Sequence, residues 1–441
     1  MTTKSQSERS TSLRKVVVAS TLGTTVEYYD FTLYATTAAL VFGPVFFPSA
    51  EPIVGVLAGF ATFFVGYLAR PIGGLLFGHY GDKLGRKNIL VITMLMMGIG
   101  TFAIGLLPGY DQIGVWAPIL LVVIRLVQGL GMGGEYGGGV LMALEYSPKP
   151  RQGLFTSIVH VGTPAGVLLP TAFVTILDAT LPDGAYEAWA WRIPFLASIL
   201  LIGVGVYIRM RVTESPEFIA AREQKELTKV PIADIFRNYS GRLVLSILAK
   251  MAESGLFNIY YVVAIALVTV ELGQERGPIL TAILIGVGVE VFTLPFFGWL
   301  SDRIGRRKVY VAGAVFQILF AVPFFLMIST GDFVLLTLAM VIAFGVGHGS
   351  MYGSQASLFA NLYPVQVRYS GLSATQQIGA TLGGGLSPLI GSALIAAAGG
   401  GWPLVLVYVL VVGLISAISA AGLRQGEASY VEPPAPERVA V

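Results

Sequence analysis

Twelve long apolar runs restrict the fold of this 441-residue chain more than any other feature. An α-helix needs about 20 apolar residues to cross a hydrocarbon layer ~30 Å thick, and each run is close to that length or longer. Only 12% of the residues are charged, whereas a soluble domain carries about a quarter. Because a backbone in lipid must satisfy its own hydrogen bonds, these runs predict helices. The sequence therefore predicts an all-α membrane protein with twelve transmembrane helices, at residues 16–42, 53–77, 89–107, 116–143, 153–177, 190–208, 243–270, 278–300, 309–328, 333–359, 370–397 and 402–422.

The distribution of lysine and arginine predicts the orientation of these helices. With the N-terminus inside the cell, 23 of the 28 Lys and Arg residues fall in segments on the cytoplasmic side. Only Arg192 and Arg276 fall in the loops on the other side. Basic residues accumulate in the cytoplasmic loops of membrane proteins. We therefore expect both termini to be cytoplasmic.

A charged sequence motif that predicts a turn occurs twice in the chain. GHYGDKLGRK begins at Gly78 after the second run, and GWLSDRIGRR begins at Gly298 after the eighth. Two related halves in a membrane protein favour alternating access to a substrate site between them, near the middle of the bilayer. The repeat divides the chain into an N-terminal tail, a six-helix bundle, a cytoplasmic linker, a second six-helix bundle and a C-terminal tail, at residues 1–15, 16–208, 209–242, 243–422 and 423–441.

The composition of this turn suits a gate at the cytoplasmic face. In each copy the first glycine permits close approach of a neighbouring helix, and the second permits a tight turn. The aspartate can cap the N-terminus of an adjacent helix, and the basic residues anchor the loop. A basic loop without a moving part is the alternative, but two copies at matching positions favour the gate. The residues predicted to form it are Gly78, Asp82, Gly85, Arg86, Asp302, Gly305 and Arg306.

Charged residues inside the apolar runs point to a polar interior. Each costs about 2.5–3.5 kcal/mol at the centre of a membrane-spanning helix, so they must pair, line a wet cavity or lie near an interface. Glu27 and Asp30 are three residues apart and share a helix face, and Arg125 lies at a comparable depth. We predict that these three residues couple proton movement to substrate binding; a permanent ion pair between Asp30 and Arg125 is the alternative. Arg70 is expected at the cytoplasmic interface.

The second half of the chain offers further candidates. Lys250 and Glu253 either neutralise each other or take part in transport, and Glu135 and Glu290 receive no role. His348, 220 residues after Gln128, is either a proton relay or substrate donor or a histidine satisfied by a neighbouring helix. Amide and hydroxyl groups can bind a carboxylate. The residues predicted to bind substrate are Tyr34, Arg125, Gln128, His348, Gln355 and Gln377.

Several kinds of site are not expected. The chain has no cysteine, and its three histidines are scattered, so we expect no metal site. Gly129, Gly131 and Gly134 match a dinucleotide-binding pattern, but no βαβ unit surrounds them, and close helix packing explains them better. We expect no cofactor, no nucleic-acid partner and no enzyme activity.

Several stretches together carry a resemblance to a known family. The repeated turn has the form G-x-x-x-D-x-x-G-R-[KR], RLVQG at Arg125 has the form R-x-x-Q-G, and TESPEF begins at Thr213. GTTVEYYDFTLYATTAALVF begins at Gly23 and VRYSGLSATQQIGATLGGGLSPLI at Val367. Together they resemble the metabolite:proton symporter family of the major facilitator superfamily.

The resemblance implies two pseudo-symmetric six-helix bundles in a bacterial inner membrane. It also implies proton-coupled uptake of a small organic acid, such as shikimate, by alternating access. The expected partners are the bilayer, protons and the substrate, and the expected functional unit is a monomer. A symporter for proline or betaine is the main alternative. A drug–proton antiporter is a weaker one, since the fifth run lacks the glycine–proline pattern of those proteins. A membrane sensor or enzyme is the alternative from another class, with no signalling domain or nucleophile triad to support it.

Overall fold

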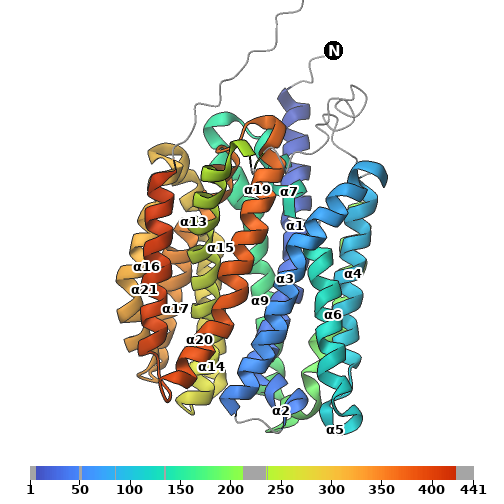
Figure 1. Ribbon diagram of the computed structural model, residues 1–441, viewed down its shortest axis with the longest axis vertical. Helices are drawn as coiled ribbons and strands as arrows, with labels where there is room; N and C mark the ends of the chain where they lie inside the picture. The colour runs from blue at the N-terminus through green and yellow to red at the C-terminus, as the bar shows by residue number, and fades with distance from the viewer. Residues whose placement is uncertain are drawn as a thin grey trace, which may run out of the picture.

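The computed structural model describes residues 6–48, 52–84, 86–133, 136–211, 235 and 237–423. Within these residues the regular structure is helical, without strands. Two groups of long helices stand side by side, the first coloured blue to green and the second yellow to red (Figure 1). The first described helix begins at the end opposite α2 (Phe42–Phe46), α5 (Tyr110–Ile113) and α14 (Ala264–Ala266).

Six long rods form the first group. Two of them comprise two successive helices each. The helices are α1 (Gln6–Leu40), α3 (Pro52–Leu84), α4 (Arg86–Leu106), α6 (Trp116–Gly133) with α7 (Tyr136–Tyr146), α8 (Gln152–His160) with α9 (Gly162–Thr180), and α10 (Arg192–Arg211). The turns η1 (Lys149–Arg151) and η2 (Tyr186–Ala190) precede α8 and α10.

Six further rods form the second group, and three of them contain π-helical turns. They are α13 (Ser240–Asn258) continued by η3 (Ile259–Val263), α14 and η4 (Leu267–Glu271), α15 (Arg276–Ile304), α16 (Arg306–Ile328), α17 (Phe333–Ile342) with η5 (Ala343–His348) and α18 (Gly349–Ala360), α19 (Val365–Ala380) with η6 (Thr381–Gly385) and α20 (Leu386–Ala397), and α21 (Pro403–Gly422). Each of the twelve predicted runs thus coincides with one rod in the described part of the chain.

The exposed surface of the rods is that of a protein in lipid. Among the described residues, nine stretches are long and apolar enough to cross a membrane. The other three predicted runs lie in α1, α4 and α10. The apolar run of α1 is interrupted by Glu27 and Asp30, and the apolar parts of α4 and α10 are shorter. Large apolar side chains such as Phe292 and Leu200 are more than two-thirds exposed. Such exposure is stable where hydrocarbon surrounds the helices.

One rod occupies the centre of the molecule. In Ser240–Glu271, 89% of the apolar window is buried inside the protein, against 44% in Arg306–Ile328 and in Pro403–Gly422. The first therefore faces other helices on all sides, whereas the last two present about half of their surface to lipid. This central rod carries Lys250 and Glu253.

Glycines allow the rods to pack closely, as the sequence predicts. A Cβ atom at Gly129 would lie 2.0 Å from the Gly66 carbonyl oxygen, and one at Gly383 would lie 2.2 Å from the Met251 carbonyl oxygen. Gly162 and Gly166 lie similarly close to the backbone of α1. The α3–α6, α13–η6 and α1–α9 contacts therefore depend on residues without side chains.

Candidate functional site

A cavity of about 50 Å³ lies where the two helix groups meet. It has room for a few water molecules. Its walls come from α1, α3, α6 and α9 on one side and from α13, η3, η5, α18 and α19 on the other. Four charged side chains line it: Glu27 and Arg70 from the first group, and Lys250 and Glu253 from the second. The cavity is therefore polar and shared by both halves.

Arg70 contributes the guanidinium group of this cavity. It is 7% exposed and lies against the rings of Phe31 and Tyr67, at 4.2 and 4.0 Å from their centroids. Its Nη2 donates to Met132 Sδ at 3.4 Å, its Nε has no hydrogen-bond partner, and within the described residues it makes no ion pair. The expectation that Arg70 lies at the cytoplasmic interface was wrong, because α3 turns this side chain toward the centre of the molecule.

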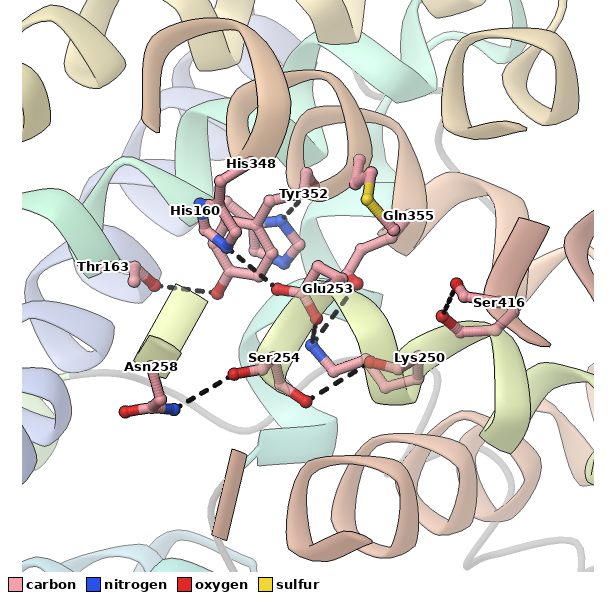
Figure 2. A network of polar contacts seen from close by, with 12 residues as sticks. His160, Thr163, Lys250, Glu253, Ser254, Asn258, His348, Tyr352, Gln355 and Ser416 are labelled. Atoms are coloured by element: carbon pink, nitrogen blue, oxygen red, sulfur yellow. Dashed lines mark hydrogen bonds and ion pairs between the residues drawn. The ribbon is translucent and has the colours of Figure 1, made fainter. Parts of the chain in front are cut away.

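The second group contributes a buried ionic network (Figure 2). Lys250 Nζ donates to Glu253 Oε2, and Gln355 bridges both side chains: its amide oxygen accepts from Nζ at 3.2 Å and its nitrogen donates to Oε2 at 3.3 Å. His348 Nε2 lies 3.1 Å from Glu253 Oε1, and His348 Nδ1 contacts Glu290 Oε1. Each of these side chains is at most 2% exposed. Local neutralisation of Lys250 by Glu253 is thus confirmed, and Glu290 acquires a partner.

A stack of rings connects this network to the first group. His160 of α8 stacks on Tyr352 at 4.1 Å between centroids, and its Nδ1 lies 3.0 Å from the Tyr352 carbonyl oxygen. The Tyr352 hydroxyl lies 2.7 Å from Thr163 Oγ1 and 3.3 Å from the Tyr28 hydroxyl. His348 stacks on the same tyrosine at 4.9 Å. Tyr352 therefore contacts both halves beside the cavity.

Arg125 lies in a separate, aromatic environment. It is 1% exposed, and its guanidinium carbon lies 3.8 Å from the Tyr34 ring centroid. Its Nη1 donates to Gln128 Oε1 at 3.0 Å, while Nε and Nη2 have no partner. The permanent ion pair between Arg125 and Asp30, the alternative to a coupling role, is not among those formed by the described residues. A Cβ at Gly66 would lie 3.2 Å from Arg125 Nη2, so this glycine makes room for the guanidinium.

The predicted substrate-binding residues divide into two sets. His348 and Gln377 line the cavity, together with Glu27 from the predicted coupling group. Gln355 lies one contact away through Lys250 and Glu253. Tyr34, Arg125, Gln128 and Asp30 are not among the lining residues. Tyr352, one of several tyrosines that the sequence indicated as able to line a pocket, also lines the cavity. Sequence reasoning gave no role to Asn258, which lines it as well.

Contacts between the two groups close one end of the molecule around Asp302. Its carboxylate accepts hydrogen bonds from the backbone N–H groups of Gly153 and Leu154, at 2.8 and 2.9 Å. These residues begin α8, so the predicted helix-capping role of Asp302 is confirmed. Arg306 Nη2 donates to Gln152 Oε1 at 3.2 Å, which adds a second contact between the groups.

Two glycines complete this end. Gly298 packs so closely on α8 that a Cβ would lie 2.0 Å from Ser157 Oγ. Gly305 has a φ of 106°, a conformation that favours glycine. Gly85 lies outside the described residues, as do the side chains of Asp82 and Arg86 and the surroundings of Gly78. The first copy of the predicted gate therefore stays a prediction.

The opposite end is closed by Arg276. Its side chain contacts Asp178, with Nε donating to Oδ1 at 2.6 Å, and Glu187 Oε1. Both carboxylates belong to the first helix group and Arg276 to the second. Burial alone would raise the pKa of Glu187, but the hydrogen bond and charge of Arg276 outweigh it and hold that pKa below its usual value. Contacts between the two helix groups thus lie at both ends of the molecule, with the cavity between them.

The chain matches the family model described as Major Facilitator Superfamily over residues 20–377 and again over residues 254–440. The chain belongs to the major facilitator superfamily. The resemblance that the motifs indicate is thus confirmed, together with the all-helical fold of two six-helix bundles. The protein is a membrane transporter and not an enzyme.

Curated relatives cover almost the full length of the chain. The shikimate transporter of Escherichia coli K12 is 38% identical over 418 residues, which are 94% of this chain and 95% of the relative. The proline/betaine transporter of the same strain is 35% identical over 425 residues, or 94% and 84% of the two chains. Among solved structures, a D-xylose–proton symporter superposes with a TM-score of 0.70 at 17% identity, covering 94% of this chain and 98% of its own. That likeness concerns the fold.

Proposed function

We propose that the protein is a proton-coupled symporter, which takes up a small organic acid such as shikimate by alternating access. It would lie in a bacterial inner membrane as a functional monomer, with both termini cytoplasmic and with bundles at 16–208 and 243–422. The shikimate transporter among its relatives supports the substrate class. The positive-inside distribution of Lys and Arg supports the orientation.

The observation that carries this proposal is the pair of cations on opposite walls of the central cavity. Arg70 comes from the first bundle and Lys250 from the second. The Arg70 Nε is buried without a partner, and a guanidinium fork suits a carboxylate through two parallel hydrogen bonds. A substrate carboxylate at Arg70 would lie beside Gln377 and His348, which also line the cavity.

The contacts at the two ends support the cycle. In the described structure both Asp302 and Arg276 join the bundles. A cavity of about 50 Å³ is too small for a ring-containing acid, so this conformation corresponds to a closed intermediate. Release of the Asp302 contacts would open the cavity to one side, and release of the Arg276 contacts would open it to the other.

For the first bundle we retain the prediction that Glu27, Asp30 and Arg125 take part in coupling. Arg125 has two N–H-bearing nitrogens without partners in this conformation. It can accept a new ligand, substrate or carboxylate, when the helices move. The gate residues of both copies of the turn are proposed to control access from the cytoplasmic side.

A second candidate substrate is a zwitterion such as proline or betaine. The cavity holds carboxylates as well as cations, since Glu27 and Glu253 line it beside Arg70 and Lys250. A zwitterion carries one positive and one negative group, so it can contact a carboxylate and a cation of the cavity at the same time. The proline/betaine transporter among the relatives supports this alternative.

Uptake into proteoliposomes tests the proposal. Purified protein is reconstituted with and without an imposed inward proton gradient, and radiolabelled shikimate, 2-oxoglutarate, citrate, proline and betaine are compared. We expect accumulation of an organic acid that requires the gradient and collapses with an uncoupler. Accumulation of proline or betaine alone would favour the second candidate. Gradient-independent equilibration of every compound would contradict symport.

A further inference from the structure

Building on the proposed function, we propose that the second bundle carries its own proton-binding site, formed by Glu253, His348 and Glu290. We call these three residues the C-terminal triad. In the closed conformation the coupling proton resides on His348 as an imidazolium held between two carboxylates. This site is distinct from the Glu27, Asp30 and Arg125 group of the first bundle.

The hydrogen-bond geometry of the ring requires this proton. His348 Nε2 lies 3.1 Å from Glu253 Oε1, and Nδ1 contacts Glu290 Oε1. A neutral imidazole donates from one nitrogen and accepts at the other. With both carboxylates ionised, its bare nitrogen would face a carboxylate oxygen with no proton between them. An imidazolium donates at both ends, so it alone satisfies both contacts while the carboxylates stay charged.

Counting charges leads to the same result. Glu253 and Glu290 carry two negative charges, and Lys250 supplies one positive charge in the same network. Protonated His348 brings the sum to zero, whereas neutral His348 leaves one net negative charge. All four side chains are at most 2% exposed, and an uncompensated charge is costly at such burial. The network is therefore balanced only with the additional proton.

The first bundle gives a different count. Its described buried charges are Glu27 and Asp30 against Arg70 and Arg125, each 7% exposed or less. These four sum to zero without any extra proton, and Glu135 of the same bundle lies outside the described residues. The network around His348 is therefore the described set that gains neutrality by binding a proton.

The triad is open to the cavity at one end. Glu253 and His348 line the cavity, whereas Glu290 is fully buried behind the ring. Glu290 Oε2 has no hydrogen-bond partner, so its ionised form depends on His348 for stabilisation. A proton can pass between cavity water and His348 Nε2 or Glu253, while Glu290 holds the ring from behind. η5 ends at His348, and π-helical turns are frequent at functional sites.

Other charged and titratable groups approach the triad from each surrounding element. Lys250 and the triad's own Glu253 come from α13. The remaining elements provide Tyr352 from α18, His160 from α8, Glu27 and Tyr28 from α1, and Tyr67 and Arg70 from α3. His160 Nε2 has no partner and its Nδ1 faces a carbonyl oxygen, so a single N–H at Nδ1 suffices there. His348 is thus the histidine that the carboxylates select for protonation.

Proton release would link the triad to substrate movement. When His348 loses its proton to cavity water, the network changes from neutral to a net charge of −1. A bound organic anion then faces an added negative charge beside Arg70 and is repelled. Bound proton and bound anion therefore favour one another, and release of the first promotes release of the second.

Nitrogen-15 NMR of histidine tests the protonation state without any transport assay. The chain has only three histidines, and loss of one set of ring signals in His348→Gln assigns that residue. We expect the wild-type His348 ring to be an imidazolium at pH 7 in detergent micelles without substrate. In Glu290→Gln the network balances with a neutral ring, so the imidazolium signals should be replaced by those of a neutral ring. Glu275→Gln removes an exposed carboxylate of the same bundle and should change nothing. A neutral His348 in the wild type would overturn the proposal.

Transport tests the coupling role separately, with the acid that the wild type accumulates, beginning with shikimate. Glu290→Gln should lose at least ten-fold of the proton-driven accumulation while retaining exchange of internal for external substrate, which needs no net proton movement. Glu275→Gln should accumulate normally. Wild-type accumulation by Glu290→Gln would refute the triad as a coupling site. Absence of proton-driven uptake in the wild type would instead refute symport, whatever the NMR result.

Discussion

Two buried arginines illustrate how the surroundings of a residue determine its use. Arg70 and Arg125 both lie against aromatic rings without forming an ion pair in the described structure. Arg70 reaches the cavity, whereas Arg125 is enclosed by Tyr34 and donates to Gln128. Cation–π contacts stabilise a desolvated guanidinium by about 2 kcal/mol. They leave its hydrogen-bond donors available, which suits a group that must bind and release an anion.

Replacing Arg70 by lysine should weaken substrate binding. Lysine keeps the charge but loses the planar fork and the stacking on the rings of Phe31 and Tyr67. One charge-assisted hydrogen bond contributes about 1.5–3 kcal/mol, so we expect KM for uptake to rise by at least about ten-fold. Arg303→Lys is the control, because Arg303 also stacks on a ring, that of Trp299, but lies exposed at the end of α15. An unchanged KM in Arg70→Lys would remove Arg70 from the binding site.

Replacing Asp30 by asparagine should abolish proton-driven accumulation, if the first bundle takes part in coupling. An asparagine side chain cannot bind and release a proton as a carboxylate can. It has nearly the same volume as aspartate and can still form hydrogen bonds. Uptake with and without an imposed proton gradient measures the effect, and exchange of labelled substrate shows that the protein still binds. Undiminished uphill uptake would remove Asp30 from coupling and leave the C-terminal triad to account for it.

Apart from the Lys250–Glu253 pair, sequence reasoning found buried charged residues but not their partners. It identified Glu27, Asp30 and Arg125, and it left Glu290 without a role. Which side chains meet across helices depends on the rotation of each helix about its axis, and that rotation decides whether Arg125 of α6 meets Asp30 of α1. The sequence did contain one indication of which polar positions lie inside the protein. The 220-residue offset between the halves relates Asp30 to Lys250, Arg70 to Glu290 and Gln128 to His348. All six positions are buried.

At the scale of the helix, the positions of the rods were predictable but their interruptions were not. Apolar length alone indicated each rod, because lipid leaves a backbone few alternatives to a helix. The π-helical turns η3, η5 and η6 lie inside rods whose apolar length gives no indication of them. η5 ends at His348 and η6 follows Gln377, so the irregular turns adjoin the cavity.

Asp302 of helix α15 joins the two bundles. Its carboxylate caps α8 of the other bundle, and a charged cap contributes about 0.3–1 kcal/mol, up to ~2 when partly buried. Asp302→Asn should therefore destabilise the closed end, slow the transport cycle several-fold and leave substrate affinity nearly unchanged. Uptake rates and substrate-induced thermal shifts measure the two effects.

Asp332→Asn provides a matched control for this experiment. Asp332 also caps a helix, accepting from the Leu335 N–H at 2.9 Å, but within its own bundle. We expect this variant to transport like the wild type. A loss of affinity with normal turnover in Asp302→Asn would contradict its role as a gate.

For the whole molecule, the sequence predicted two related bundles and a site between them, and the fold is confirmed. The contacts at the Asp302 end were indicated by the repeated turn. The closure at the other end was not, because Arg276, Asp178 and Glu187 lie in segments with no repeated pattern. Their contact arises only when the two bundles are assembled. Long-range pairing between surface charges is set by the arrangement of whole bundles, which local sequence does not encode.

The Arg276 contact should make closure of this end depend on pH. Since the pKa of Glu187 is held below its ordinary value of 4.5, the ionised carboxylate favours the closed end at higher pH. This contribution is lost as the pH falls through the lowered pKa. The chain has no cysteine, so spin labels at Asp183→Cys and Thr330→Cys report the separation of the bundles. We expect the short-distance population to be larger at pH 7 than at pH 3.5.

The Glu187→Gln variant distinguishes the effect of this carboxylate from that of the other carboxylates that titrate over the same pH range. A glutamine cannot ionise, so the variant should have a smaller closed population at pH 7 and a weaker pH dependence than the protein with Glu187. Arg276→Gln should reduce closure at pH 7 as well, because both carboxylates lose their partner. An identical pH response in the spin-labelled protein with and without the Glu187→Gln change would show that the bundles close at this end independently of the ion pair. The Asp302 end would then have to control access by itself.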